Sequence, residues 1–201
     1  MFKKILIANR GEIACRVIRT AREMGIQTVA VCSEADTRAL HVEMADDSVL
    51  IGPAAAAESY LNVDNIMKAI ADTGADAVHP GYGFLSENAA FAKALQKAGV
   101  AFIGPKPEAI TVMGDKIESK KVALKAGVNT VPGDGGAVEN AAEAVKAANA
   151  IGYPVMLKST AGGGGIGMQV CNDEAALQRA FDSVRGLGER NFGDAGVFLE
   201  A

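Results

Sequence analysis

A lysine followed by a run of glycines is the feature of this chain that most clearly suggests chemistry. Four consecutive glycines come four residues after Lys158: Gly162, Gly163, Gly164 and Gly165. Apolar, strand-like runs lie on both sides, at residues 153–157 and 167–171. Glycine is costly to order, so such a loop makes sense where bare backbone closes over a ligand. Backbone N–H groups beside a lysine suit a polyphosphate, and the pattern predicts a lid over a nucleotide.

Two lysines differ in how strongly their surroundings indicate a ligand. Lys158 ends a strand whose other residues are apolar, where an unpaired cation is costly unless it meets an anion. Lys116, taken alone, is typical of a solvated helix lysine.

A second glycine-containing segment, residues 79–88, reads His-Pro-Gly-Tyr-Gly-Phe-Leu-Ser-Glu-Asn. It leaves a predicted strand at its carboxyl end, which is where open α/β sheets bind ligands. Turn formation and helix capping explain its glycines and serine equally well. For His79 we favour a packed histidine at a strand end over a catalytic one.

The turn Asn9-Arg10-Gly11-Glu12 allows two interpretations. It could bind phosphate as in dinucleotide-binding folds, but it lacks the G-x-G-x-x-G spacing, and only Glu34 and Asp36 could supply the acidic residue after the second strand. We favour an ordinary strand-to-helix turn that Arg10 and Glu12 fix.

Composition narrows the class of protein. The chain has 201 residues, 49% of them hydrophobic, and a net charge of −4 without a basic block, which argues against nucleic acid as a partner. The apolar run at the start is too short for a signal peptide or membrane span. Three cysteines and two histidines, with no close cysteine pair, indicate neither a disulfide framework nor a zinc site. We therefore expect packed cysteines, His41 at a helix start, and a cytoplasmic protein.

Strand and helix signals alternate along the first half of the chain, which predicts an α/β fold with a parallel sheet covered on both faces. Predicted strands are residues 4–8, 27–32, 75–78 and 100–103, and predicted helices are 12–24, 65–72 and 88–98. One helix over 113–125 and a connector over 127–136 follow. Helices at 139–149 and 173–187, with strands at 153–157, 167–171 and 196–200, predict a small α+β lid domain.

Four segments together resemble biotin carboxylase, the ATP-grasp component of biotin-dependent carboxylases. They are Ile-Ala-Asn-Arg-Gly-Glu-Ile-Ala at 7–14 and residues 79–88, 113–116 and 158–168. The resemblance implies a Rossmann-like domain (pre-ATP-grasp) at 1–113, a helical linker at 114–132 and an ATP-grasp lid at 133–201. It implies a ligase that uses ATP, Mg²⁺ and bicarbonate to carboxylate biotin on a carrier protein.

The resemblance also implies roles for single residues. Lys116 and Lys158 correspond to lysines that contact ATP phosphates, and Gly162 to Gly165 with Gly167 to the lid loop. Glu200 corresponds to the acidic residue facing adenine. Tyr82 and Gly83 resemble positions on the biotin side of the cleft. Arg16 and Arg19 fall on a helix used for homodimer contacts in bacterial members. A biotin carboxyl carrier domain and a carboxyltransferase are the implied partners.

Two departures from the family pattern matter. The family continues beyond Ala201 into the domain that holds its magnesium and bicarbonate residues, so no metal or catalytic residue is assigned and the chain alone is expected to be inactive. Ile166 stands where the common lid loop carries a cation.

The glycine loop and residues 192–200 resemble urea carboxylase, whereas residues 41–46 and 118–133 look more like subunits of propionyl-CoA-type carboxylases. The final carboxyl acceptor therefore stays open.

Two other functions remain as alternatives. One is another ATP-grasp ligase, such as a carbamoyl-phosphate synthetase, although the segment 79–88 argues against it. The other is a non-catalytic module that binds nucleotide weakly or mediates assembly through Arg16 and Arg19.

Overall fold

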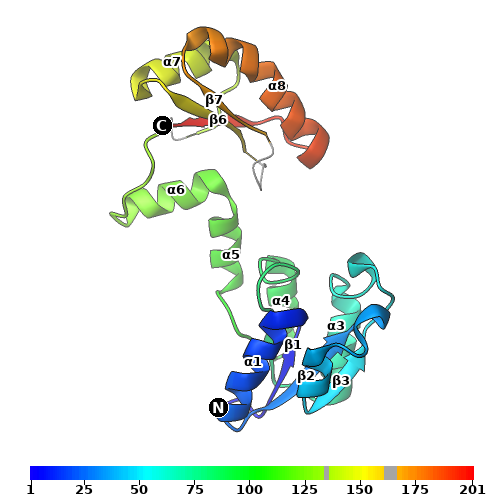
Figure 1. The fold of residues 1–201 in the computed structure, drawn as a ribbon. Coiled ribbons are helices and arrows are strands. Elements are labelled where there is room, and N and C mark those ends of the chain that lie inside the picture. The colour runs from blue at the N-terminus through cyan, green and yellow to red at the C-terminus, as the bar shows by residue number, and fades with distance from the viewer. Residues whose placement is uncertain (134–135, 161–166) are drawn as a thin grey trace. The chain divides into compact units, whose positions relative to one another are not determined.

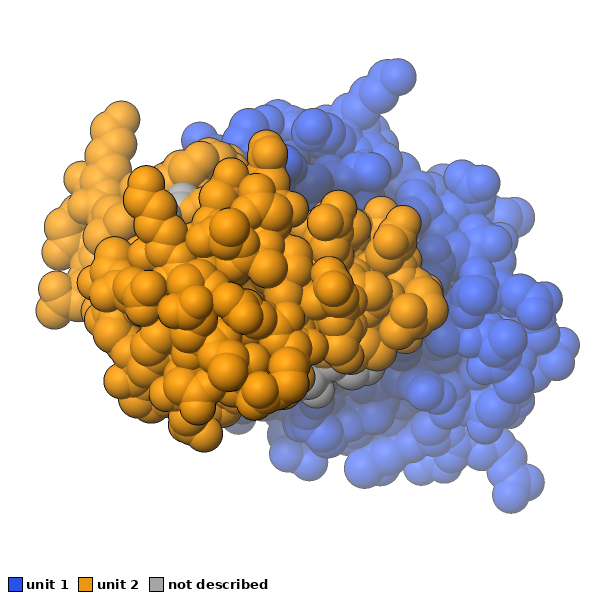
Figure 2. Space-filling view, turned by 90° about the horizontal axis from the view of Figure 1, so that it is seen from above, with its two compact units in different colours: residues 1–111 blue, residues 112–201 orange. Residues whose placement is uncertain are grey.

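The computed structural model describes residues 1–133, 136–160 and 167–201. The chain divides into two compact units, Met1–Thr111 and Val112–Ala201, which Figure 2 colours blue and orange. The boundary between them falls inside helix α5 (Pro107–Gly114).

The first unit is built on a parallel sheet, as the alternation of strands and helices predicted, with five strands where four were predicted. Its strands are β1 (Lys4–Ile7), β2 (Gln27–Cys32), β3 (Asp47–Leu50), β4 (Ala77–His79) and β5 (Ala101–Phe102), in the order β3-β2-β1-β4-β5. The helices are α1 (Gly11–Glu23), α2 (Leu40–Met44), α3 (Val63–Thr73) and α4 (Ala89–Lys97). Short 3-10 turns lie at Glu34–Asp36 and Ala56–Glu58. The order of the strands reverses between β1 and β4, which pair in parallel, so their carboxyl ends are neighbours.

Alternate residues of β1 point to opposite faces of the sheet, and both faces are buried. Ile5 and Ile7 pack with Ile18 of α1 on one face. Leu6 packs on the other face with side chains of α3 and α4, including Phe91. A strand buried on both faces reads as a continuous apolar run, which is why the sequence identified it.

The second unit has a three-stranded antiparallel sheet with two helices, α7 (Ala141–Ile151) and α8 (Glu174–Phe192), on one face (Figure 1). The elements are α6 (Lys116–Lys125), α7 (Ala141–Ile151), β6 (Val155–Ser159), β7 (Met168–Cys171), α8 (Glu174–Phe192) and β8 (Val197–Glu200). The strand order is β7-β6-β8. Leu157 and Leu199 pack with α7 and α8, for example against Phe181. The residues that alternate with them, among them Lys158 and Glu200, belong to the opposite face.

The expected single helix over 113–125 is interrupted, and the structure has α5 and α6 instead. Asp115 lies between them with extended backbone, and its carboxylate accepts hydrogen bonds from the N–H groups of Ile117 and Glu118. An aspartate that caps a new helix in this way satisfies N–H groups which a continuous helix would have bonded internally.

Four smaller differences concern element ends and short elements. Helix α8 continues to Phe192, five residues beyond the predicted end at 187, and β6 is shifted to Val155–Ser159. Strand β3 and helix α2 were not predicted.

No helix within the described ranges is long and apolar enough to cross a membrane.

Candidate functional site

An open pocket of about 530 Å³ lies in the second unit, on the face of the sheet that α7 and α8 leave uncovered. Lys158 comes from β6, Met168 from β7, and Phe198 and Glu200 from β8, while α6 supplies Lys116 and Lys120. Three lysines and one carboxylate give the pocket a net positive charge. Met168 and Phe198 add apolar surface beside these charges. Such a combination suits a ligand with a polyanionic end and a flat apolar end.

The lysines converge on Glu200. The ammonium group of Lys158 forms an ion pair with Oε2 of this carboxylate, and Nζ of Lys120 lies 3.3 Å from Oε1. Burial raises the pKa of Glu200, but the hydrogen bonds and charges of Lys158 and Lys120 outweigh it and hold the pKa below its usual value. Glu200 is therefore ionised at neutral pH. The anion that the sequence analysis required beside Lys158 is, in the structure, this carboxylate.

Lys116 reaches the same strand from α6. Its Nζ donates to the backbone oxygen of Ser159 at 3.4 Å. Partial burial, together with the charge of Lys158, lowers the pKa of Lys116. The two neighbouring ammonium groups repel each other, and a bound anion would relieve that repulsion.

The glycine loop is described only at its end. Gly162 to Gly165 and Ile166 lie outside the described residues. Gly167 has a φ of +72°, and a Cβ there would lie 3.0 Å from Cβ of Ser159. Glycine at this position therefore permits both the turn and the close approach to β6.

In the first unit, the loop after β4 presents Tyr82 to solvent, with 62% of its surface exposed. The tyrosine hydroxyl donates a hydrogen bond to Oε1 of Glu12, at the start of α1. Gly81 and Gly83 have φ values of +65° and +63°, which place them in the left-handed region. Next to them, Phe84 is the non-glycine residue with positive φ among those described, at 40°. Three of the four residues 81–84 thus have positive φ, which gives the loop a sharply turned backbone.

His79 and His41 are packed residues. The Nδ1 atom of His79 accepts a hydrogen bond from the Gly81 N–H at 3.0 Å, and burial lowers the pKa of this histidine. His41, the second residue of α2, is buried, and its Nε2 lies 3.2 Å from the oxygen of Val31. Cys15, Cys32 and Cys171 are all buried and free, as expected of small apolar side chains.

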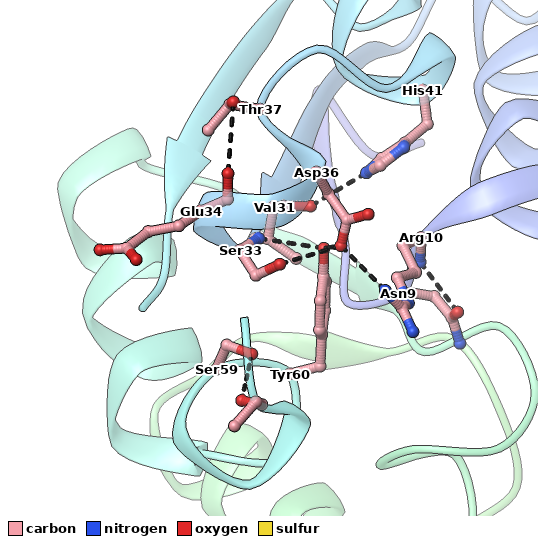
Figure 3. Close-up of polar contacts among 11 residues, drawn as sticks. Asn9, Arg10, Val31, Ser33, Glu34, Asp36, Thr37, His41, Ser59 and Tyr60 are labelled. Carbon is pink, nitrogen blue, oxygen red and sulfur yellow. Dashed lines mark hydrogen bonds and ion pairs between the residues drawn. The ribbon is translucent and has the colours of Figure 1, made fainter. Parts of the chain in front are cut away.

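The turn after β1 is tied to its neighbours by an aspartate hub (Figure 3). Oδ2 of Asp36 accepts hydrogen bonds from Arg10, Ser33 and Tyr60, at 3.0, 2.9 and 2.7 Å. The turn has no glycine immediately after β1, where a dinucleotide-binding turn would have one. The carboxylate of Asp36 is occupied by hydrogen bonds within the protein. These contacts fit the ordinary structural turn, although Arg10 and Glu12 fix it together with Asp36.

Sequence reasoning missed two of these residues. Lys120 lies one helical turn after Lys116, so their i, i+4 spacing on α6 could have indicated a shared face. Asn9 is buried, and no local pattern indicated that its Nδ2 would donate hydrogen bonds to the backbone oxygens of Pro80 and Tyr82. Arg16 and Arg19 lie on exposed positions of α1. Among the described residues, no group of three histidine, cysteine, aspartate or glutamate side chains could hold a metal ion.

Two family models match the chain. The model described as biotin carboxylase, N-terminal domain, covers residues 1–110. The model described as carbamoyl-phosphate synthase L chain, ATP binding domain, covers residues 115–201.

Among curated relatives, the propionyl-CoA carboxylase alpha chain of Ruegeria pomeroyi is 58% identical over 200 residues, which is 100% of this chain and 29% of that protein. Biotin carboxylase 1 of Bacillus subtilis is 52% identical over 200 residues, or 44% of its length. The chain thus spans less than half the length of these relatives.

Solved structures agree with these matches. A biotin carboxylase from Campylobacter jejuni, in complex with β,γ-ATP, superposes with a TM-score of 0.92 and 48% identity, covering 100% of this chain and 45% of that one. The biotin carboxylase domain dimer of Hydrogenobacter thermophilus 2-oxoglutarate carboxylase, with MgADP, ADP and bicarbonate, gives 0.89 and 48%, with coverage of 100% and 44%. With the matching fold and the N-terminal family model over more than half of its residues, the chain belongs to the biotin carboxylase family.

Proposed function

We propose that this chain forms the first part of a biotin carboxylase, in which ATP and bicarbonate are used to carboxylate biotin on a carrier protein. The observation that carries the proposal is the pocket on the open face of the second sheet, where Lys116, Lys158 and Lys120 surround Glu200 beside Met168. Polyphosphate recognition requires several cations and an apolar surface for the base, and this pocket has both.

Each residue of the pocket has a proposed task. Lys116 and Lys158 bind phosphate oxygens, and the glycine loop Gly162 to Gly165 with Gly167 closes over them. Glu200 faces the adenine. Before ATP binds, Glu200 also holds the Lys158 side chain in place, and a phosphate group then competes with Glu200 for the Lys158 ammonium group. ATP supplies the activated phosphoryl group; transfer of such a group depends on positioning and charge neutralisation. The lysines contribute part of the neutralisation, and magnesium contributes another part.

In the first unit, we assign Tyr82 and Gly83 to the biotin side of the reaction. The exposed ring of Tyr82 is held through its hydroxyl by Glu12, so a biotin ring would meet a surface already in place. The loop lies after β4, beside the turn after β1, where the chain order of the sheet reverses. Ligands of open α/β sheets bind at this kind of position.

The proposal extends to domains and partners. We assign residues 1–113 to a Rossmann-like domain, 114–132 to a helical linker and 133–201 to the ATP-grasp lid. The biotin carboxyl carrier domain and a carboxyltransferase are the proposed partners, in a cytoplasmic enzyme. A homodimer through Arg16 and Arg19 is proposed as well, since the Hydrogenobacter thermophilus relative is a dimer. Likeness to propionyl-CoA carboxylase favours an acyl-CoA acceptor over urea.

Calorimetric titration of the 201-residue chain with Mg-ATP tests the nucleotide part. We expect binding that Lys158→Gln abolishes, because the substitution removes the ammonium group that lies on the open sheet face. Lys146→Gln is the matched control: it removes the same charge from an exposed position of α7 in the same unit. Equal loss of binding in both variants, or binding unaffected by Lys158→Gln, would contradict the proposed phosphate site.

Turnover forms a second test. Because the relatives are more than twice as long, we expect the 201-residue chain by itself to show no bicarbonate-dependent ATP hydrolysis. Release of phosphate from ATP that rises on addition of bicarbonate and free biotin would show that the chain is catalytically sufficient and would overturn this part of the proposal.

A further inference from the structure

The loop after β4 is held by two sets of contacts, from residues that sequence motifs did not single out as a group. The first contact is made by Asn9, which is buried two residues after the end of β1. Its Nδ2 donates to the backbone oxygens of Pro80 and Tyr82, both at 2.8 Å. Its Oδ1 accepts from the N–H of Arg10 at 2.9 Å. One amide thus joins the turn after β1 to the two carbonyls on either side of Gly81.

The second contact is an aromatic one. The rings of Tyr60 and Phe84 are stacked, with centroids 5.1 Å apart and an interplanar angle of 4°. The Arg10 guanidinium lies 5.3 Å from the Tyr60 ring centroid and 5.8 Å from that of Phe84. A cation near two ring faces attracts both, so Arg10 holds Phe84 against Tyr60.

Asp36 forms hydrogen bonds with both Arg10 and Tyr60. The same oxygen, Oδ2, accepts hydrogen bonds from the Arg10 guanidinium and the Tyr60 hydroxyl, and Ser33 supplies a third (Figure 3). Hydrogen bonds to a carboxylate are stronger than those between neutral groups. Asp36 therefore bonds both of the side chains, Arg10 and Tyr60, against which the ring of Phe84 packs.

Phe84 needs such support. Its φ of 40° is rare for a residue with a side chain, and a conformation of this kind persists only where the surroundings determine it. Phe84 lies two residues after Tyr82 and next to Gly83. The conformation of Phe84 therefore sets the direction in which the chain leaves the two residues that we assign to biotin.

We propose that Asp36 is a positioning residue for biotin: through Arg10, Tyr60 and Phe84 it fixes the conformation of residues 81–84, and it acts on Tyr82 and Gly83 only through these partners. The inference rests on the proposed function for the meaning of the loop. The mechanical part, that Asp36 orders the loop through Arg10, stands on the contacts alone.

Hydrogen exchange measured by NMR on the 201-residue chain tests the mechanical part. The reporters are the N–H groups of Gly81, bonded to His79 Nδ1, and of Ser86, bonded to the oxygen of Gly83. For Asp36→Asn we expect both to exchange on the order of tenfold faster, the effect of losing a charge-assisted contact. The amides of Leu6 and Ile7 in β1 report global opening and should keep their rates.

Glu34→Gln is the matched control, because it removes one carboxylate from the same 3-10 turn at an exposed position. It should leave all four rates unchanged. Arg10→Gln approaches the network from the other side and should reproduce the effect of Asp36→Asn, and the double substitution should add little to either. Equal acceleration at Leu6 and Gly81 would mean that Asp36 only stabilises the unit, and additive effects would mean that it does not act through Arg10; either result overturns the proposal.

Free biotin distinguishes the positioning role from the proposed function. In the unsubstituted chain, added biotin should shift the amide resonances of Tyr82 and Gly83, and Asp36→Asn should weaken this binding several-fold. If biotin shifts neither resonance in any variant, the assignment of the loop to biotin fails, and the exchange rates still decide whether Asp36 orders the loop. If biotin binds Asp36→Asn and the unsubstituted chain equally, the positioning role for biotin is wrong.

Discussion

Lys158 and Glu200 form an ion pair on the open face of the antiparallel sheet, from diagonal positions on the neighbouring strands β6 and β8. Glu200 lies directly opposite Met156 in the register, and Lys158 is two residues further along β6. Both side chains are mostly covered, with 25% and 17% of their surface exposed. The pair links the strand that enters the glycine loop to the last strand of the unit.

Loss of this pair should be visible in stability. Lys158→Gln leaves Glu200 with Lys120 as its cation, so we expect the free energy of unfolding to fall by about 1 kcal/mol at pH 7. Since the folded-state pKa of Glu200 is depressed, the contribution is present above the unfolded pKa of about 4.3 and is lost as the pH falls through the folded pKa. Urea unfolding followed by circular dichroism, at pH 7 and pH 3, measures both. A difference from the unsubstituted chain that persists unchanged at pH 3 would show that the charge pair is not its source.

Two glycines of α8 should respond to alanine in opposite directions. At Gly188 a Cβ would lie 2.4 Å from Oγ of Ser159 and 2.6 Å from the backbone oxygen of Asp194, so Gly188→Ala forces β6 and α8 apart. We expect a loss of about 2 kcal/mol or more. At Gly186 the nearest atom is the end of the Arg190 side chain at 3.1 Å, which can move. Gly186→Ala should gain about 0.5 to 1 kcal/mol from helix propensity. Thermal unfolding of both variants checks the contrast, and a stabilised Gly188→Ala would contradict the packing.

Asp115 should be needed for the start of α6. None of the described side chains of this helix is buried, so packing contributes little to its formation. We expect Asp115→Ala to lose about 1 kcal/mol of helix stability, whereas Asp115→Asn, which still accepts the bonds from Ile117 and Glu118, should lose little. Exchange rates of the α6 amides report the effect. Equal rates in the two variants would show that the cap does not hold the helix.

Tyr60 should ionise last among the tyrosines. Burial, with the hydrogen bond to Asp36, raises its pKa from 10.0 to about 12. A raised folded-state pKa means that this stabilising contribution is complete below pH 10 and is lost as the pH rises through about 12. Absorbance of tyrosinate in a pH titration should show a late phase that Tyr60→Phe removes and Tyr82→Phe leaves. A late phase that survives in Tyr60→Phe belongs to another residue.

The sequence predicted the parallel sheet because its central strands are buried on both faces and appear as short apolar runs. Strand β3 escaped prediction for the opposite reason: it is an edge strand, and Asp47, Ser48 and Leu50 are exposed. Helix α6 likewise has no buried side chain to mark a face, so only the cap at Asp115 separates it from α5. Local patterns report burial, and elements without burial leave a weak signal.

Site residues could be predicted where the type of a residue and its immediate neighbours in the sequence were enough to indicate a role. Lys158 at the end of an apolar strand required an anion, but the identity of that anion depends on the pairing of β6 with β8, which lie 42 residues apart at this point. The Asp36 hub likewise joins residues 24 and 26 positions apart. Such contacts are set by the tertiary arrangement, and spacing along a single sequence does not contain them.

Gly81 and Asn9 have a consequence for the sequences that this fold can accept. A Cβ at position 81 would lie 2.7 Å from Nδ2 of Asn9, and the glycine φ of +65° disfavours other residues as well. Conversely, a side chain larger than asparagine at position 9 would press on the bare backbone of Gly81. The residues that are tolerated at one of these two positions, 72 residues apart in the chain, therefore depend on the residue at the other. In a library that randomises both, the tolerated pairs should be few and should change together.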